Sequence, residues 1–150
     1  MIFERSKDGI LDVKEGIIAH QVNCCNTIGA GVSRAIITRY PKVEGAYHEM
    51  CNKKGKDGAF GMIQTIRVGE NLVIANIFSQ KDFGNSKKTG IVYTDMNLLT
   101  ESLKYLLKTN SKVYVPQYIG CGLAGGDWHE FLKLMKDTDI HIRGLEKEEK

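Results

Sequence analysis

The chain has 150 residues, of which 42% are hydrophobic and 26% charged, as expected for one globular domain that buries its own core. Its net charge of +3 is well short of the basic excess of a dedicated nucleic-acid-binding domain. The charged start of the sequence and its short apolar runs are not typical of a signal peptide or a membrane-spanning helix, so we expect no membrane partner.

Short β-rich runs alternate with helical patterns along the chain. Several of the predicted strands are continuous runs of Val, Ile and Leu, which is typical of strands covered by helices on both faces. This order predicts a single α/β domain over residues 1–145, with a three-layer α/β/α architecture and a mixed, mostly parallel central sheet, followed by a charged tail over 146–150. In chain order, the predicted strands span 2–4, 16–22, 61–68, 72–78, 112–116 and 139–143, and the predicted helices span 32–40, 41–51, 94–108 and 128–136.

Two strand-to-helix connections are rich in glycine. In the first, a buried strand ends near Asn23, and Gly29, Ala30 and Gly31 then lead into a helix. Glycines allow backbone N–H groups to approach an anion closely, and the start of a helix favours negative charge. An ordinary tight turn is the alternative explanation of this pattern.

The second connection has four glycines in seven residues, from Gly120 to Gly126. Its first six residues match GxGxxG, but only 25 residues remain after Gly125, too few for the rest of a dinucleotide-binding domain. Neither connection ends in Gly-Lys-Ser/Thr, which excludes a P-loop. Two phosphate-binding loops without these motifs suit a diphosphate held between them.

Together the two loops resemble those of the macro domain, a fold that recognises ADP-ribose. The resemblance covers nearly the whole chain and is carried by residues 17–32, 74–80 and 119–128. It is strongest to the branch that contains ADP-ribose-1″-phosphate phosphatases, the terminal ADP-ribose glycohydrolase type and DNA-repairing antitoxin macro domains. Small phage and bacterial proteins carry the same segments.

The resemblance implies a set of site residues. Asn23 would meet the terminal ribose, and the loop Gly29, Ala30, Gly31 and Val32 would lie near that ribose and the diphosphate. The second loop would close over the diphosphate with Gly120, Cys121, Gly122, Leu123, Ala124 and Gly125, while Gln80 and Tyr118 would also line the site. The family's Gly-Asp-Ile/Leu adenine motif reads Asp8, Gly9 and Ile10 here, so that the aspartate is displaced by one position.

The sequence departs from the glycohydrolase type at the two positions that carry the chemistry of that type. Ala124 stands in place of the second-loop aspartate, and the region of the family lysine reads Ser79, Gln80 and Lys81. That lysine–aspartate mechanism is therefore not expected to operate unchanged, although Lys81 could replace the lysine by a small shift.

Three residues carry both a functional and a structural interpretation. His20 could donate a proton to a leaving oxygen or contact a terminal phosphate, or it could be a buried histidine hydrogen-bonded to the backbone. Asp127 could position a water, although its spacing to Glu130 fits a helix N-cap, which we favour. For Cys121, close packing between glycines is favoured over a nucleophilic thiol.

Cysteine and histidine patterns give no sign of a metal site. There is no CxxC motif, and the four cysteines are too few and too irregular for a disulfide framework. We expect reduced thiols, a cytoplasmic location, and neither a metal nor a cofactor. The expected thiols are Cys24, Cys25, Cys51 and Cys121. The histidines that share no metal-ligand spacing are His48, His129 and His141.

The leading hypothesis is a monomeric macro-domain hydrolase acting at the terminal ribose of ADP-ribose, either as an ADP-ribose-1″-phosphate phosphatase or as an ADP-ribosyl hydrolase. Water would attack while Asn23, His20 and Asp127 or Lys81 position it or assist the leaving group. One alternative is a module that binds ADP-ribose without turnover, which the loss of the aspartate at Ala124 favours. Another is removal of ADP-ribose from modified DNA or protein.

Overall fold

The computed structural model describes residues 1–146, so most of the charged tail predicted over 146–150 lies outside the described residues. Six strands form one sheet in the order β1-β6-β5-β2-β4-β3. Every neighbouring pair is parallel except β3 and β4, which are antiparallel. The strands are β1 (Ile2–Ser6), β2 (Gly16–Asn23), β3 (Ile63–Arg67), β4 (Leu72–Gln80), β5 (Val113–Pro116) and β6 (His141–Leu145).

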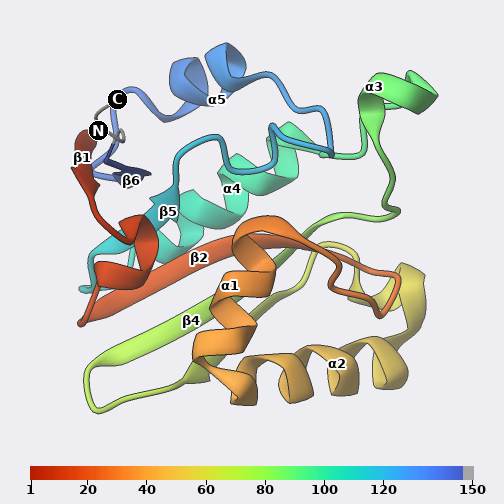
Figure 1. The fold of residues 1–150 in the computed structure, drawn as a ribbon, viewed down its shortest axis with the longest axis horizontal. Helices are drawn as coiled ribbons and strands as arrows, with labels where there is room; N and C mark the ends of the chain where they lie inside the picture. The colour runs from red at the N-terminus through yellow and green to blue at the C-terminus, as the bar shows by residue number, and fades with distance from the viewer. Residues whose placement is uncertain (147–150) are drawn as a thin grey trace.

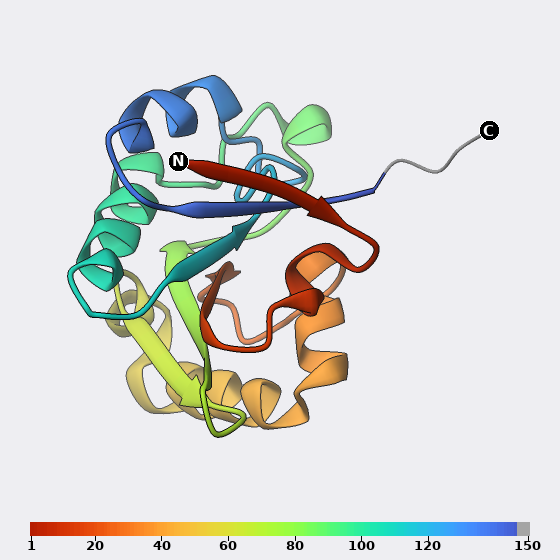
Figure 2. The same ribbon diagram turned by 90° about the vertical axis from the view of Figure 1, so that its left-hand side faces the viewer.

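Helices cover both faces of this sheet, which confirms the predicted three-layer α/β/α architecture (Figures 1 and 2). One face carries α4 and α5, and the other carries η1, α1 and α2. The short helix α3 lies outside the two layers, beyond the end of β4 (Figure 1). The helices are η1 (Gly9–Asp12), α1 (Gly31–Arg39), α2 (Pro41–Ala59), α3 (Ser86–Thr89), α4 (Met96–Leu107) and α5 (Trp128–Met135).

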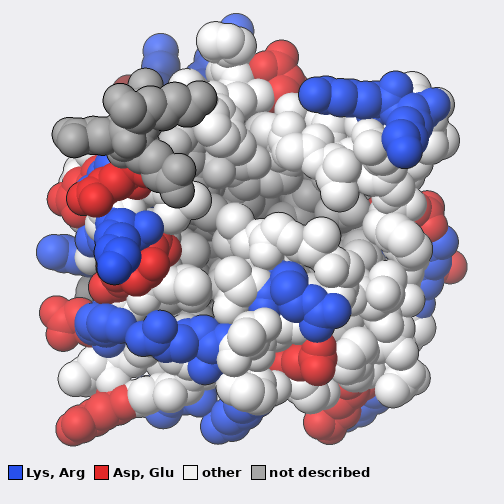
Figure 3. All heavy atoms as spheres, viewed as in Figure 1, with Lys and Arg blue, Asp and Glu red and all other residues white. Residues whose placement is uncertain are grey.

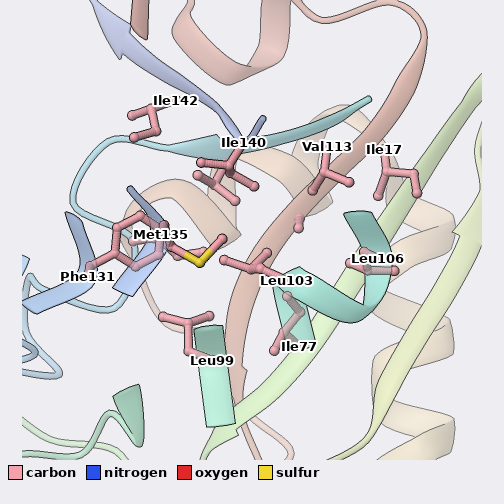
Figure 4. Close-up of a cluster of buried hydrophobic side chains, with 14 of the residues drawn as sticks. Ile17, Ile77, Leu99, Leu103, Leu106, Val113, Phe131, Met135, Ile140 and Ile142 are labelled. Atoms are coloured by element: carbon pink, nitrogen blue, oxygen red, sulfur yellow. The ribbon is translucent and has the colours of Figure 1, made fainter. Parts of the chain in front are cut away.

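The largest buried cluster lies between the sheet and the α4–α5 layer (Figure 4). Leu99 and Leu103 of α4 point toward the strands and are fully buried, as the 3.6-residue stripe in the sequence predicts. Phe131 and Met135 of α5 fill the space beside them and are also fully buried. This packing fixes α5, and with it the loop that precedes α5.

Helix α2 extends well beyond its predicted end at residue 51. The run from Lys53 to Lys56, which lies beyond the helix predicted over 41–51, is part of α2, which continues to Ala59. Gly55 has φ 70 inside this helix, so the axis is kinked there rather than ended. The helices η1 and α3 have only four residues each, too short for a periodic pattern, and were not predicted.

Candidate functional site: a groove at the carboxyl ends of the strands

Three adjoining pockets form one groove beyond the carboxyl ends of β2, β4 and β5. A middle pocket of about 340 Å³ shares Ala30, Ser33 and Leu123 with a distal pocket of about 380 Å³. At its other end it shares Val32 and Tyr118 with a pocket of about 680 Å³, which we call the η1-side pocket. In Figure 3 the central hollow of this face is lined by residues other than Lys, Arg, Asp and Glu, with Lys and Arg side chains around it over α1 and α3. The charged lining residues Arg5, Asp8 and Arg143 belong to the η1-side pocket.

The first glycine-rich loop leads from β2 into α1 and lines all three pockets. Gly31 opens the helix with φ 72, a conformation that favours glycine. The N-cap residue, Ala30, has no side-chain oxygen and makes no capping hydrogen bond. The first N–H groups of α1 are therefore uncapped by any side chain at the edge of the middle pocket, where an anion could accept from them.

Asn23 holds the first loop in shape. Its Nδ2 donates to the Thr27 carbonyl at 2.9 Å, and its Oδ1 accepts from the Cys25 N–H at 2.8 Å. The hydroxyl of the buried Tyr47 also donates to Asn23 Oδ1, at 2.8 Å. Asn23 lines the distal pocket, and both of its polar atoms already make hydrogen bonds to the loop or to Tyr47.

A polar network ties the second glycine-rich loop to β2 and β4. Gln21 Nε2 donates to the Thr94 hydroxyl at 2.8 Å, and that hydroxyl donates to the Gly120 carbonyl at 2.6 Å. Gln21 Oε1 accepts from the Ser79 hydroxyl at 2.6 Å. Gly126 N–H donates to the Gly120 carbonyl at 2.9 Å, so the loop also closes on itself. The floor of the groove is therefore fixed by side chains rather than left to the loop alone.

Most residues that the resemblance implies as ligand-binding line this groove. Asp8, Gly9 and Ile10 line the η1-side pocket, although the sequence order of the first two is inverted. Cys121 and Gly125 are not among the residues that line the three pockets. The remaining predicted residues that do line the groove are Asn23, Gly29, Ala30, Gly31, Val32, Gln80, Tyr118, Gly120, Gly122, Leu123 and Ala124.

His20 is among the residues that line the middle pocket, but its side chain is fully buried, which favours the structural interpretation of this residue. Its partners are side chains rather than the expected backbone: Nε2 lies 2.5 Å from Asn76 Oδ1 and Nδ1 lies 2.8 Å from Ser33 Oγ. A neutral ring satisfies both, because Nε2–H donates to the amide oxygen and Nδ1 accepts from the hydroxyl. Burial lowers the pKa of His20 to about 4, although the hydrogen bond to Asn76 opposes this, so the ring is uncharged at neutral pH.

The other candidate catalytic residues are held in structural contacts outside the pockets. Asp127 caps α5, as favoured from sequence, by accepting from the His129 N–H at 2.9 Å. Lys81 Nζ pairs with Asp57 of α2 at 2.6 Å. Burial raises the pKa of the Cys121 thiol to about 11, and the thiol donates to the Ile119 carbonyl, so Cys121 is a poor nucleophile.

The distal pocket has a neutral lining. No Asp, Glu, His, Lys, Arg or Cys is found among the described residues that line it. Its polar side chains are amides and hydroxyls, including Gln80 and Asn85. Sequence reasoning did not select Gln21, Ser33, Phe83 or Asn85, and only the position of Gln21 on the strand that enters the first loop could have indicated it.

Within residues 1–146, no group of three or more His, Cys, Asp or Glu side chains is arranged to hold a metal ion. None of the helices in this range has the length and apolar character needed to cross a membrane.

The chain matches no protein-family model and no curated protein sequence, but it resembles solved structures over nearly its whole length. A Bacteroides thetaiotaomicron protein of unknown function is 21% identical with a TM-score of 0.78, over 96% of this chain and 97% of that one. A Streptomyces coelicolor macrodomain protein is 22% identical with a TM-score of 0.69, over 98% and 99%. Thermosipho africanus DarTG, solved in complex with ADP-ribose, is 16% identical with a TM-score of 0.63, over 91% of this chain and 39% of that one. These similarities show that the chain has the macrodomain fold, which the two glycine-rich loops predict.

Proposed function

We propose that this protein binds ADP-ribose along the groove. The adenosine would occupy the η1-side pocket, the diphosphate the middle pocket and the terminal ribose the distal pocket. One observation carries the proposal: helix α1 begins beside the middle pocket, and its N-cap residue, Ala30, provides no side-chain cap for the first N–H groups. Uncapped N–H groups at a helix start are suited to a diphosphate.

Two further observations support this assignment. Thermosipho africanus DarTG, which has the same fold over most of this chain, was solved with ADP-ribose bound. Gly29 and Gly122, from the two loops, have no other atom within 4 Å of the point where a Cβ would lie. A bound diphosphate would fill the space at Gly122 and the terminal ribose the space at Gly29, and both would benefit from close approach to the backbone.

Binding without turnover is the function that the distal pocket supports best. Acid–base catalysis needs a titratable group within hydrogen-bond reach of the reacting atoms. The described lining of the distal pocket contains no carboxylate, imidazole, amine or thiol, and Ala124 stands where the family aspartate would be. Of the candidate catalytic groups, His20 is buried and neutral, and Lys81 is paired with Asp57.

Hydrolysis of ADP-ribose 1″-phosphate is a second candidate, favoured by two amide groups of the distal pocket. Gln80 Oε1 accepts from Gln21, and Asn85 Oδ1 accepts from the Lys87 N–H. The NH₂ groups of Gln80 and Asn85 donate to no acceptor within residues 1–146, so they could bind a 1″-phosphate. Catalysis would then rest on positioning water and phosphate.

Removal of ADP-ribose from modified DNA or protein would use the same groove. The distal pocket is bordered by Phe83 and Leu123, which are 58% and 59% exposed, and by α3, which carries Lys87 and Lys88. An attached polymer would leave the groove across this apolar and basic edge.

Calorimetric titration with ADP-ribose, AMP and NAD tests the binding proposal. We expect one ADP-ribose per chain, weaker binding of AMP, and loss of ADP-ribose binding in Gly122→Val. No heat with millimolar ADP-ribose would overturn the proposal. Gly45→Val on α2, at a glycine that also has no neighbour within 4 Å and lines none of the three pockets, serves as the matched control.

Phosphate release from ADP-ribose 1″-phosphate separates the two candidates. If the protein only binds, phosphate release in its presence will equal the release in buffer alone. ADP-ribose 1″-phosphate and ADP-ribose will nevertheless compete for the same site. Release that disappears in Gln80→Ala and persists in Lys81→Ala would instead establish the second candidate. An ADP-ribosylated oligonucleotide and an ADP-ribosylated peptide, assayed for free ADP-ribose, test the third.

A further inference from the structure

The hydroxyl of Tyr47 joins helix α2 to the segment that leads from β2 into the first glycine-rich loop. Tyr47 lies on α2 and is fully buried. Its ring packs nearly parallel to the ring of Phe78 on β4, with 5.7 Å between the two ring centres and 11° between their planes. The hydroxyl is therefore held on a rigid support. A buried polar group is costly unless it is hydrogen-bonded, so the partners of this hydroxyl are informative.

The hydroxyl uses both its donor and its acceptor capacity on the turn over residues 23–27. It accepts from the Thr27 N–H at 3.1 Å and donates to Asn23 Oδ1 at 2.8 Å. The carbonyl oxygens of Asn23 and Thr27 also lie near it, at 3.0 and 3.3 Å. Tyr47 thus contacts both ends of the turn and fixes the turn against α2.

The other contacts between this turn and α2 are weaker. Asn26 lies within the turn with φ 62, a left-handed conformation that asparagine adopts more readily than most residues. Its Oδ1 lies 2.6 Å from His48 Nδ1, and its Nδ2 donates to Asn52 Oδ1 at 3.2 Å. Both contacts are exposed, so water competes for the same groups. The buried hydroxyl of Tyr47 is therefore the main anchor of the turn.

The contacts of Asn23 leave one N–H of its side chain for a ligand. Oδ1 accepts from the Cys25 N–H and from the Tyr47 hydroxyl, both at 2.8 Å, which occupies the two acceptor sites of an amide oxygen. Nδ2 donates one of its two hydrogens to the Thr27 carbonyl at 2.9 Å. The second hydrogen has no acceptor within residues 1–146, and Asn23 lines the distal pocket. Asn23 can therefore offer that pocket a donor but not an acceptor.

From this we infer that Tyr47 is a positioning residue for the terminal ribose. The inference rests on the proposed placement of that ribose in the distal pocket and deepens it. Tyr47 holds the Asn23 amide with its oxygen turned to the protein and its second N–H left for an oxygen of the ribose. The diphosphate and the adenosine would lie in the other two pockets. Loss of the Tyr47 hydroxyl should therefore weaken binding of the ribose end of the ligand and spare the adenosine end.

Titration of Tyr47→Phe with ADP-ribose and with AMP tests the inference. Phe keeps the ring that packs on Phe78 and removes only the hydroxyl. We expect ADP-ribose to bind about three- to tenfold more weakly, as the loss of one hydrogen bond would give. AMP has no terminal ribose, so its affinity should stay within about twofold of the natural value. A ratio of ADP-ribose affinity to AMP affinity that stays constant or rises would overturn the inference.

A matched control removes a buried hydroxyl away from the groove. Thr100 on α4 is 1% exposed, and its hydroxyl donates to the Met96 carbonyl at 2.9 Å. Thr100→Val should leave the affinity ratio at its natural value, even where thermal melting shows this variant to be less stable. The same fall of the ratio in Thr100→Val would show that general destabilisation produces it, and would overturn the inference.

A double variant tests whether Tyr47 acts through Asn23. Asn23→Ala alone should weaken ADP-ribose binding about tenfold or more, because the donor itself is lost. Addition of Tyr47→Phe to Asn23→Ala should then change the affinity by less than about twofold, since the amide that Tyr47 positions is absent. Losses that multiply in the double variant would overturn the link between the two residues.

Magnetic resonance of the natural protein keeps the test valid if Tyr47→Phe does not fold. The side-chain amide protons of Asn23 are identified by their absence from the spectrum of Asn23→Ala. ADP-ribose should shift the signal of one of these protons, and AMP should shift neither. ADP-ribose that binds without shifting them would overturn only this inference, whereas a failure of ADP-ribose to bind would overturn the proposed function and the inference together.

Discussion

The first glycine-rich loop, residues 29–31, and the second, residues 120–126, both line the groove, but an added side chain would meet different surroundings in each. At Gly29 and Gly31 a Cβ would have no neighbour within 4 Å. At Gly126 it would lie 2.5 Å from the Gly120 carbonyl oxygen, and at Gly125 it would clash with Ser86. Gly122 is the exception in the second loop, since a Cβ there would also meet open space.

This difference separates glycines that the fold requires from glycines that a ligand would require. Gly125 and Gly126 allow the second loop to fold back on Gly120 and pack on α3, so they belong to the architecture. Gly29 and Gly122 have neither a positive φ nor a close neighbour within the protein. A composition rich in glycine therefore does not by itself identify a phosphate-binding loop, whereas glycines facing empty space across a groove do support one.

The largest effect is expected for Gly125→Ala. The residue has φ 78, and the new methyl group would overlap Ser86. The strained backbone and the overlap together should lower the free energy of unfolding by about 2–4 kcal/mol. Urea denaturation measures this change. A variant as stable as the natural protein would contradict the distinction between the two loops.

The neutral state of His20 makes stability depend on pH. Its pKa of about 4 in the folded protein lies below the ordinary 6.5, so protonation favours the unfolded chain. The stability contribution is complete above pH 6.5 and falls by about 3 kcal/mol as the pH approaches 4. Unfolding free energies at several pH values should show this slope in the natural protein and in His129→Gln, which alters an exposed histidine, but not in His20→Gln.

Gly122→Val should separate binding from folding. Its side chain would extend into open space, so the free energy of unfolding should change by less than about 0.5 kcal/mol. The same side chain would occupy the middle pocket, and ADP-ribose affinity should fall by about tenfold or more. Paired calorimetry and thermal melting measure the two quantities. Unchanged affinity would show that the second loop does not contact the ligand at this position.

The smallest effect is expected for Lys81→Ala. The Lys81–Asp57 pair is exposed at the surface, so its loss should change the free energy of unfolding by less than about 1 kcal/mol. ADP-ribose affinity should stay within about twofold of the natural value, because Lys81 does not line the groove. A large loss of affinity or of turnover in this variant would show that Lys81 takes part in ligand binding or catalysis.

Most of the fold could be predicted from the sequence, because its elements have strong local patterns. The stripe on α4 and the apolar runs of β2 and β4 correspond closely to the observed elements. The continuation of α2 through Gly55 could not be predicted, since packing of Tyr47, Cys51 and Ala59 keeps the helix together around a residue that usually ends one.

The location of the site was also predictable, but its chemistry was not. Loops after parallel strands necessarily meet at one edge of the sheet, and this brought the two glycine-rich loops together. Whether His20, Asp127 and Lys81 are free to react depends on their partners Asn76, Ser33 and Asp57, and on the cap of α5. Asn76, Ser33 and Asp57 are brought to His20 and Lys81 by tertiary contacts that no local spacing encodes, whereas the cap of α5 follows from the local spacing of Asp127 and Glu130.

The pairing of β1 with β6 has a consequence for synthesis of the protein. The first strand lies at the edge of the sheet and pairs with the last one described, near the end of the chain (Figure 2). On the ribosome, residues 2–6 must wait for residues 141–145, with Ile2 and Phe3 unpaired in the meantime. Because Ile142 of β6 is a member of the largest buried cluster, the same late strand that pairs with β1 also completes that core.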